Sequence, residues 1–290
     1  MPAIPDEALD CVVYLYPDAE AADRGMRGGG SGCIVSLPKF EDGLSFAYII
    51  TNSHVIREGK SGVVRVNTRD GNTLSILSKA EHWHHHSSGD DLAALSINLE
   101  YDLANIKAIP DSWFITQEAI QKYRIGPGDD IFMPGRFVNH EGKQRNLPAV
   151  RFGNLSMLPH EPIRTGRGLL QECFLIECRS LPGYSGSPVF LFSMLPTPVR
   201  QAPPPPMLLG IDFGHIQDAL PILNREELKQ GRKVPIDKCW AVEANTGMSC
   251  VVPAWKIKEL LFSDELINIR AETLKKINTP ITPANDDKSK

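Results

Sequence analysis

A histidine, an aspartate and a serine stand far apart in the chain, each in a local pattern that would present it at a strand end or in a tight turn. His54 follows an apolar run within Thr-Asn-Ser-His-Val, and Asp91 directly precedes Leu-Ala-Ala-Leu. Ser185 lies in Leu-Pro-Gly-Tyr-Ser-Gly-Ser-Pro, which indicates a glycine-flanked turn before a new strand. A serine hydroxyl is a weak nucleophile unless a base lies within hydrogen-bond reach, and an imidazole base needs an acceptor that fixes its tautomer. These residue types therefore match a nucleophile, a general base and an orienting carboxylate.

Each pattern alone also has an ordinary structural explanation. A histidine at a strand end is often a hydrogen-bonded structural residue, an aspartate there can be a solvated cap, and a glycine-rich turn can be a surface loop. The order of the three residues along the chain narrows the choice of fold, because α/β-hydrolases place the serine first and the histidine last. Here the histidine comes first and the serine last, so an esterase of that fold is disfavoured. Asp90 competes with Asp91 for the role of the acid.

Taken together, the three segments resemble the His, Asp and Ser motifs of chymotrypsin-like serine peptidases, and they are most similar to the HtrA-type and bacterial glutamyl endopeptidase branches. The similarity extends from about residue 9 to residue 262. It implies that Ser185 is the nucleophile, His54 the general base and Asp91 the acid, since the acid of this motif directly precedes Leu-Ala. The backbone amides of Gly183 and Ser185 would form the oxyanion hole, where one donor typically contributes about 3 kcal/mol to transition-state stabilisation.

The same resemblance places the substrate pocket but leaves its preference open. Arg179 and Ser180 would lie at the floor of the pocket, and an unpaired arginine there would favour an acidic side chain before the scissile bond. Asp212 stands where the glutamyl endopeptidases carry a histidine, and its carboxylate would either neutralise Arg179 or attract a basic side chain. Gly214 and His215 would line the wall strand that pairs with the substrate backbone.

One departure from the family concerns activation. Trypsin-type zymogens carry an aspartate before the nucleophile that pairs with a newly cut N-terminus, whereas this chain has Tyr184. We therefore expect a serine endopeptidase that acts through an acyl-enzyme, is selective or gated, takes protein or peptide substrates and has a regulatory protein partner. The alternative is a catalytically silent peptidase-fold module that binds a protein partner, and a third option is an acyltransferase or esterase that uses the same serine.

No cofactor and no metal are expected. The segment from His82 to His86 contains four histidines, but adjacent histidines on an extended loop rarely converge on one ion, and no Asp or Cys is spaced to help. The glycine-rich segment from Gly25 to Gly32 lacks the Lys-Ser/Thr of a phosphate-binding loop. We expect that segment to lead into a strand.

Composition and charge exclude several classes of partner. The chain has 31 basic and 35 acidic residues and a formal net charge of −4, so it has no excess of cations for a nucleic acid or an anionic membrane. The N-terminal ten residues are acidic and proline-containing where a signal peptide needs a basic start and an apolar core, and no later run is long and apolar enough to span a membrane. These features predict a cytoplasmic protein without nucleic-acid or membrane partners, with its six cysteines as buried thiols.

The elements that must position these residues are short β-rich runs separated by glycine and proline. They predict an all-β fold of two tandem six-stranded antiparallel barrels with a C-terminal helix. Within a peptidase domain over residues 1–262, we expect the first barrel at 9–112, the second at 128–253 and the start of the C-terminal helix at 254–262. That helix is expected to pack on the second barrel. Residues 263–290 are expected to form a helical extension and a loose tail.

Two insertions interrupt the second β-rich block, at residues 191–209 and 216–238. The first is rich in proline and predicts an exposed, extended loop. In the second, Asn224 can cap a short helix that Gly231 ends. This second insertion is expected to border the substrate cleft as a lid or a partner surface.

Overall fold

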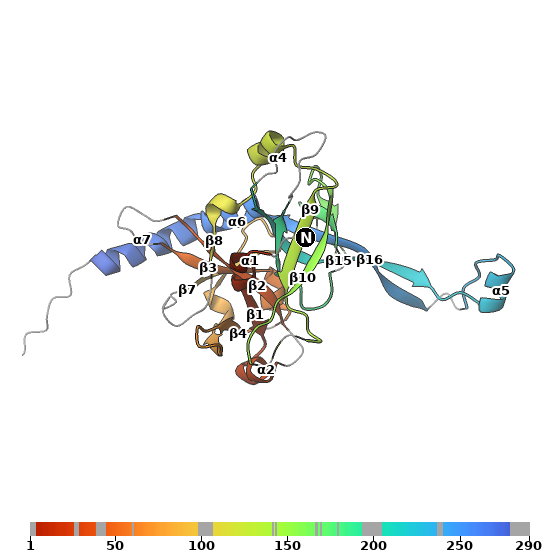
Figure 1. Ribbon diagram of the computed structural model, residues 1–290, viewed down its shortest axis with the longest axis horizontal. Helices are drawn as coiled ribbons and strands as arrows, with labels where there is room; N and C mark the ends of the chain where they lie inside the picture. The colour runs from red at the N-terminus through yellow and green to blue at the C-terminus, as the bar shows by residue number, and fades with distance from the viewer. Residues whose placement is uncertain are drawn as a thin grey trace, which may run out of the picture.

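The computed structural model shows a mostly β protein with helices at its C-terminal end (Figure 1). It describes residues 4–25, 29–38, 45–59, 61–97, 107–140, 142, 144–165, 168, 170–178, 180–192, 205–236 and 240–278. The proline-rich segment at 193–204, the predicted pocket residue Arg179 and the tail after residue 278 lie outside these residues. Among the described residues, no helix is long and apolar enough to cross a membrane.

The N-terminal half forms one eight-stranded sheet in the order β5-β4-β1-β2-β3-β7-β6, with β8 paired in parallel to β2. Its strands are β1 (Val12–Tyr16), β2 (Gly30–Ser36), β3 (Ala47–Thr51), β4 (Val63–Asn67), β5 (Thr73–Leu77), β6 (Trp83–His85), β7 (Ala93–Ile97) and β8 (Ile109–Pro110). All other pairings in the sheet are antiparallel. Between the described residues of its two end strands, β5 and β6, no pairing closes the sheet. The first half of the expected pair of barrels is thus a curled sheet with open ends.

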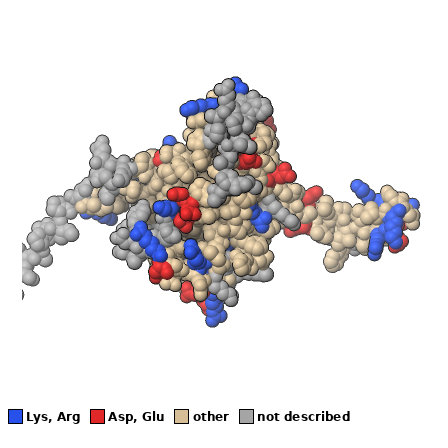
Figure 2. Space-filling view, viewed as in Figure 1, with Lys and Arg blue, Asp and Glu red and all other residues tan. Residues whose placement is uncertain are grey.

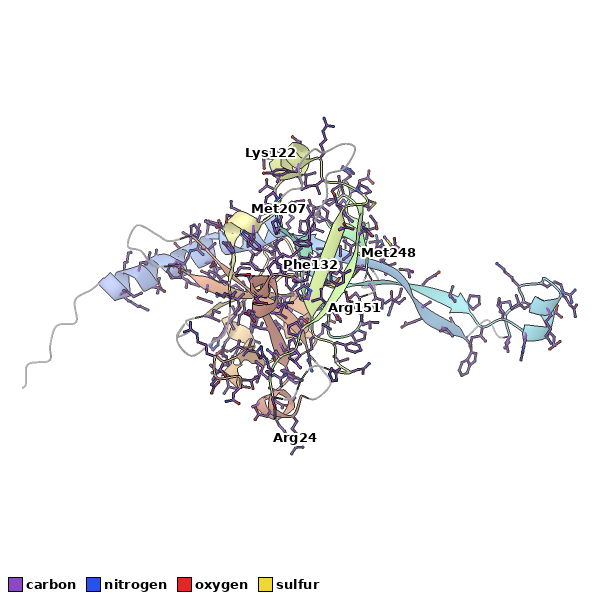
Figure 3. All side chains as sticks on the ribbon, viewed as in Figure 1. Arg24, Lys122, Phe132, Arg151, Met207 and Met248 are labelled. Carbon is purple, nitrogen blue, oxygen red and sulfur yellow. The ribbon has the colours of Figure 1, made fainter. Side chains whose placement is uncertain are left out.

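The C-terminal half forms a closed barrel in the order β10-β13-β16-β15-β14-β9, as expected from the sequence. Its strands are β9 (Asp130–Gly135), β10 (Ala149–Met157), β13 (Phe174–Glu177), β14 (Pro188–Leu191), β15 (Met207–Pro221) and β16 (Ala241–Pro253). The short strands β11 (Ile163–Arg164) and β12 (Leu170–Gln171) pair beside it. On the neighbouring strands β9 and β14, the buried rings of Phe132 (labelled in Figure 3) and Phe190 stack with centroids 5.0 Å apart.

Two of the short helices, α4 (Gln117–Tyr123) and α5 (Arg225–Lys229), begin at side chains that cap them, and for α5 the sequence predicted this cap. In α4 the side chain of Thr116 accepts a hydrogen bond from the amide of Ala119, and in α5 Asn224 accepts from two amides. A cap of this type typically contributes about 1 kcal/mol to helix stability. The remaining helices are α1 (Asp6–Asp10), α2 (Ala19–Arg24), α3 (Ser53–Arg57), α6 (Ala254–Leu261) and α7 (Asp264–Asn278), with 3₁₀ turns at Ala80–His82 and Asp111–Trp113.

The C-terminal helices join the two halves of the molecule. Helix α6 begins after Pro253, and it lies against β15 and β16 of the barrel and against β7 of the first sheet. From α7, the guanidinium of Arg270 donates to the hydroxyl of Tyr48 in β3, at 3.0 Å, and to the carbonyl of Leu261, at 2.7 Å. The expected packing of the helix after Pro253 on the second barrel is confirmed for α6, and the buried arginine of α7 adds a contact with the first sheet.

The second insertion is a long arm and not a lid. Strands β15 and β16 continue out of the barrel as a two-stranded ribbon that projects away from the body and carries α5 at its tip (Figure 1). Most of the ribbon is uncharged, and basic side chains gather near the tip (Figure 2). The expected short helix is present, but the ribbon's direction follows from the pairing of its strands, which the sequence analysis did not foresee.

An arginine and an asparagine close the seam between the two halves. Arg65 of β4 is fully buried and donates to the side chain of Asn146 at 2.7 Å and to the carbonyl of Ala22 at 2.6 Å. The Asn146 side chain donates back to the carbonyl of Arg65 at 2.8 Å, and its amide donates to the side chain of Asn67 at 2.7 Å. A buried donor or acceptor that loses its partner costs about 1 to 3 kcal/mol.

We expect the substitution Asn146→Ala to lower the free energy of unfolding by about 3 kcal/mol, because it strands a guanidinium N–H and a carbonyl inside the seam. Urea denaturation followed by tryptophan fluorescence measures the loss. The control is Asn154→Ala, since Asn154 bonds to Asp130 at the exposed surface, and its cost should stay below about 1 kcal/mol. Equal losses for the two variants would contradict a specific role for the seam.

Candidate active site

His54 and Asp91 meet because their strands are neighbours. Strands β3 and β7 pair with Thr51 opposite Ala93, so the start of α3 lies beside the residue just before β7. His54 therefore sits in the first turn of α3, with its Nδ1 at 2.6 Å from the Asp91 Oδ2 and its backbone amide donating to Oδ1 at 2.9 Å. Both side chains are largely buried, with exposed fractions of 11% and 8%. The carboxylate thus fixes the ring through two hydrogen bonds.

A second layer of contacts decides which of the two adjacent aspartates faces the histidine. Asn52 donates to the backbone carbonyl of Asp91 at 2.9 Å, and the amide of Asp91 donates to the side chain of Gln171 at 3.1 Å. The same Gln171 side chain donates to Asp90 at 2.6 Å. Asp90 is therefore held by Gln171, and Asp91 is the carboxylate that contacts His54.

The turn that carries Ser185 is wedged between the two halves of the molecule. Gly186 has a φ of +90°, and a Cβ atom there would lie 1.9 Å from the carbonyl oxygen of Ser31 and 2.4 Å from the hydroxyl of Thr51. The amide of Ser31 donates to the carbonyl of Ser185 at 2.8 Å, and the amide of Gly186 donates to the carbonyl of Asp212 at 2.8 Å. Only glycine fits this approach. It brings Ser185 to the end of β3, from which α3 and His54 continue.

The amides of the turn fall into two groups. Those of Tyr184 and Ser187 donate within the turn, at 3.0 Å to Leu181 and at 2.8 Å to Tyr184, whereas those of Gly183 and Ser185 have no acceptor among the residues that the structure describes. Two amides that point away from internal acceptors are available to an oxygen of a bound molecule. Within the same set of residues, the Ser185 hydroxyl makes no hydrogen bond to His54. Bonds of this type are often formed only when substrate binds.

Ser31 fixes the orientation of the peptide group next to these amides. Its hydroxyl donates to the carbonyl of Gly183 at 2.7 Å and accepts from the amide of Arg136 at 2.9 Å. Gly183 itself has a φ of +98°, and a Cβ atom there would lie 2.6 Å from Val138. The hydroxyl of Ser31 therefore joins the loop that contains Gly183 and the backbone at Arg136 to the first sheet.

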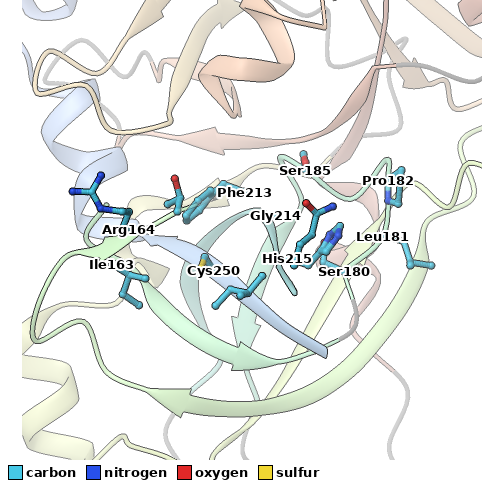
Figure 4. A pocket seen from close by; sticks show the side chains of 13 residues that line it. Ile163, Arg164, Ser180, Leu181, Pro182, Ser185, Phe213, Gly214, His215 and Cys250 are labelled. Atoms are coloured by element: carbon cyan, nitrogen blue, oxygen red, sulfur yellow. The ribbon is translucent and has the colours of Figure 1, made fainter. Parts of the chain in front are cut away.

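A cavity of about 500 Å³ opens beside Ser185 (Figure 4). Three short segments line it together with Ser185 and Cys250, namely residues 163–165, residues 180–182 and residues 213–217. The predicted pocket residues Ser180, Gly214 and His215 are thus among its walls. Partial burial lowers the pKa of His215, which favours the neutral imidazole in this wall. Arg179 lies outside the described residues, so its predicted place at the pocket floor stays a prediction.

Asp212 lies beneath the cavity and does not reach it. Its side chain is fully buried, and it accepts hydrogen bonds from the hydroxyl of Ser180, at 2.8 Å, and from the hydroxyl of Ser249. Burial raises the pKa of the carboxyl from 3.8 to about 6, although these hydrogen bonds and the nearby His54 act in the opposite direction. The expected attraction of a basic substrate by Asp212 would therefore be indirect, through Ser180.

The histidine-rich segment belongs to a charged network beside Asp91. His86 Nδ1 lies 3.1 Å from Asp90 and its Nε2 lies 3.4 Å from Glu259, so an aspartate does approach this run, contrary to the sequence expectation. The ammonium of Lys256 lies 3.1 Å from Glu259 and 3.6 Å from Asp90. Lys256 thus places a positive charge between these two carboxylates.

The comparison with known families decides the assignment. The family model described as a trypsin-like peptidase domain matches residues 30–193, more than half of the chain, including His54, Asp91 and Ser185. The chain belongs to the trypsin-like peptidase family. This result confirms, for the family, the resemblance to chymotrypsin-like serine peptidases.

Several solved structures are similar to this trypsin-like peptidase domain at low sequence identity. Deg5 is 19% identical, with a TM-score of 0.44, over 72% of this chain and 81% of Deg5. The HtrA-type protease AlgW with a decapeptide is 15% identical, with a TM-score of 0.47, over 93% of this chain and 66% of AlgW. This chain therefore spans about two thirds of the length of AlgW. No curated protein matches the sequence.

Three residues of this trypsin-like peptidase site were missed by sequence reasoning. Asn52 stands two residues before His54 in the quoted motif, so its place was visible but its role was not. Ser31 lies in Gly-Ser-Gly, which was assigned only to the start of a strand. Gln171 carries no local signal, because its contact with Asp91 joins residues 80 positions apart.

We expect Ser31→Ala to slow the labelling of Ser185 by a fluorophosphonate about tenfold, because the loop that contains Gly183 loses its hydroxyl anchor and the two free amides become less well ordered. Labelling followed by mass spectrometry gives the rate. Ser36→Ala at the other end of β2 is the control and should label at the wild-type rate. An unchanged rate in Ser31→Ala would show that the loop holds its geometry without this hydroxyl.

Asp212 predicts a dependence of stability on pH. Its pKa is raised in the folded state, so the folded protein binds more protons than the unfolded chain between about pH 4 and pH 6, and stability falls as pH rises through this range. Relative to the wild type, Asp212→Asn should gain up to about 3 kcal/mol in unfolding free energy between pH 4 and pH 7. Urea denaturation at four pH values tests this. Asp218→Asn, on the exposed part of β15, is the control, and curves for Asp212→Asn that stay parallel to the wild type would contradict the prediction.

Proposed function

We propose that the chain is a serine endopeptidase that cleaves peptide bonds through an acyl-enzyme on Ser185. The observation that carries this proposal is the bidentate contact of Asp91 with His54, on the element next to the Ser185 turn. Because the carboxylate accepts from Nδ1, the Nε2 of the ring is left as the acceptor for the proton of the nucleophile. The family match and the position of the cavity beside Ser185 support the same assignment.

The proposed reaction follows from these positions. His54 Nε2 removes the hydroxyl proton as the Ser185 oxygen attacks the carbonyl carbon of the scissile bond, and the negative charge passes to the carbonyl oxygen. The amides of Gly183 and Ser185 donate to that oxygen, and Asp91 stabilises the imidazolium. The imidazolium then gives its proton to the leaving amine, and the C–N bond breaks. Water, deprotonated by His54, attacks the acyl carbon, the C–O bond to Ser185 breaks, and the imidazolium returns the proton to the serine oxygen as the second product leaves.

Tyr184 supports a proposal about control. It replaces the aspartate that pairs with a new N-terminus in trypsin-type zymogens, and its ring is fully buried, with its hydroxyl donating to the carbonyl of Ala149 at 3.1 Å. The guanidinium of Arg151 lies over the ring at 4.8 Å. The turn is thus anchored by a side chain already present in the uncut chain. We therefore infer that activity is gated by substrate or by a regulatory protein, and not by cleavage at the N-terminus.

The roles assigned to Ser185, His54 and Asp91 predict losses of activity of different sizes when each residue is replaced. Fluorophosphonate should label the wild type at a stoichiometry near one, and Ser185→Ala should abolish labelling. Turnover of a peptide substrate should fall by on the order of 10⁶-fold in Ser185→Ala or His54→Ala and by about 10⁴-fold in Asp91→Asn. Asp90→Asn is the matched control for the acid, and its loss should be at least 100-fold smaller than that of Asp91→Asn, because Asp90 contacts Gln171 and not His54.

Two outcomes would redirect the proposal. Equal losses in the Asp90 and Asp91 variants would remove the acid role from Asp91. Absence of labelling and of cleavage of β-casein, in a chain that still binds β-casein, would identify a peptidase-fold binding module, the alternative derived from the sequence.

A further inference from the structure

The arm of β15 and β16 is continuous with the wall of the cavity. Residues 213–217 of β15 line the cavity beside Ser185, and the same strand then runs on to Pro221. Along the arm, Gln217 pairs with Asn245 and Pro221 with Ala241. The ribbon therefore begins at the candidate active site and leads away from it as one strand, whose pairing with β16 shifts register between His215 and Gln217.

Toward its outer end, one face of the arm exposes large apolar side chains, which lie beyond Asp218 on the same face. Leu220 lies directly opposite Val242, and Trp240 stands two residues from Val242 and so on the same face. Their exposed fractions are 48%, 55% and 67%. On the other face, Ala219 lies opposite the charged Glu243. A two-stranded ribbon is only marginally stable in water, so an apolar face confined to one side indicates a surface that a ligand covers.

One edge of β15 is also free. Strand β14 pairs with β15 only as far as Ile211, and the last backbone contact on that side is at Asp212, with the turn after Ser185. From Phe213 outward, β15 pairs with β16 alone among the strands that the structure describes. Pro221 has no backbone N–H, so it ends the stretch that can accept another strand. A free edge of residues 213–220 spans about 25 Å of extended chain.

We propose that the arm is an exosite for the substrate, an inference that rests on the proposed peptidase function. An extended segment on one side of the scissile bond adds to the free edge of β15 as a third strand, from the cavity to Leu220. Its side chains at alternate positions then pack beside Leu220, and Val242 and Trp240 continue this apolar surface on the far side of β15. The exosite selects substrates that carry an extended segment with apolar side chains at every second residue, about five to eight residues from the bond that is cut.

Two other occupants of the face fit the structure less well. A lid over the cavity is excluded by direction, since the arm projects away from the body (Figure 1). A second copy of the chain would need about 800 Å² of buried surface per partner, which Leu220, Val242 and Trp240 do not supply without the exposed Leu228, Val234 and Ile236 toward the tip. The continuity of the arm with the cavity wall favours the substrate itself.

Peptides of matched length test the exosite. A β-casein site cut by the wild type gives a six-residue core peptide, and about eight residues of alternating Val and Thr are added before it or after it. Alternating Ser and Thr make the polar control extension. We expect one of the two Val-Thr extensions to raise kcat/KM at least tenfold over the core, and the matching Ser-Thr extension to raise it less than threefold.

Variants separate the arm from the catalytic residues. Leu220→Lys should remove most of the gain from the Val-Thr extension and Val242→Lys, one strand further from the free edge, a smaller part, whereas Ala219→Lys, on the opposite face, should keep the gain. The core peptide should be cleaved at equal rates by all of them, since it does not reach the arm. Equal rates on extended and core peptides, or equal effects of Leu220→Lys and Ala219→Lys, would overturn the proposal.

A binding measurement distinguishes failure of the exosite from failure of the proposed function. The Ser185→Ala chain, titrated into the fluorescein-labelled Val-Thr peptide, should bind at least tenfold more tightly than the Ser185→Ala chain that also carries Leu220→Lys. This result would support the exosite even if no peptide were cleaved. Equal binding by both chains would overturn it. Sedimentation velocity supplies the last outcome, because a wild-type dimer that Leu220→Lys converts to a monomer would assign the face to self-association and also overturn the proposal.

Discussion

The candidate active site depends on the close approach of Gly186 to the first sheet. The turn that bears Ser185 belongs to the closed barrel, yet the carbonyl of Ser31 and the hydroxyl of Thr51 leave no room for a side chain at position 186. His54 and Asp91 belong to the first sheet. Neither half of the molecule contains the site alone, so its geometry is set by the seam. The buried pairing of Arg65 with Asn146 closes the same seam, and its energy therefore contributes to holding the site together.

The two buried carboxylates near the site, Asp91 and Asp212, accept hydrogen bonds from different kinds of donor. Asp91 accepts from the ring and the amide of His54, so a partial positive charge on the imidazole has a carboxylate 2.6 Å away. Asp212 accepts from two hydroxyl groups and from the backbone of Gly214, and burial nevertheless raises its pKa to about 6. Its backbone nonetheless holds the turn, since its carbonyl accepts from Gly186 and its amide donates to Ser187 at 2.9 Å. The backbone of Asp212 therefore joins the pocket wall to the turn, although the carboxyl group of this residue is costly to bury.

Local signals in the sequence were sufficient for some elements and not for others. The helices after Thr116 and Asn224 were predictable because a capping side chain and the amides it accepts from are three or fewer residues apart. Strand β5 was missed because its residues alternate without a buried face. The open ends of the first sheet depend on which distant strands pair, and no short pattern encodes that.

The residues of the site also fall into two groups, those that local patterns indicate and those whose roles depend on distant contacts. The motifs around His54, Asp91 and Ser185 indicated the residues, because each motif is a strand end or turn with its own local chemistry. The choice of Asp91 over Asp90 followed from the resemblance, and the geometric reason lies in Gln171, which approaches from the other half of the molecule. The hydroxyl of Ser31 bonds to a carbonyl 152 residues away, so its role arises only when the seam forms.

The arm has a free strand edge, a feature that usually promotes aggregation, next to the candidate active site. A free strand edge with an apolar face invites pairing with any extended chain, and proteins usually protect such edges with charge or proline. Here Asp218 and Pro221 lie toward the outer end of β15, whereas the stretch from Phe213 to Gln217 that lines the cavity carries neither. Pairing is therefore least opposed next to Ser185, it meets one charged side chain at Asp218, and it ends at Pro221. With Asp218 and Pro221 placed in this way, the edge binds a substrate segment that already lies in the cavity. The segment then continues outward along the arm.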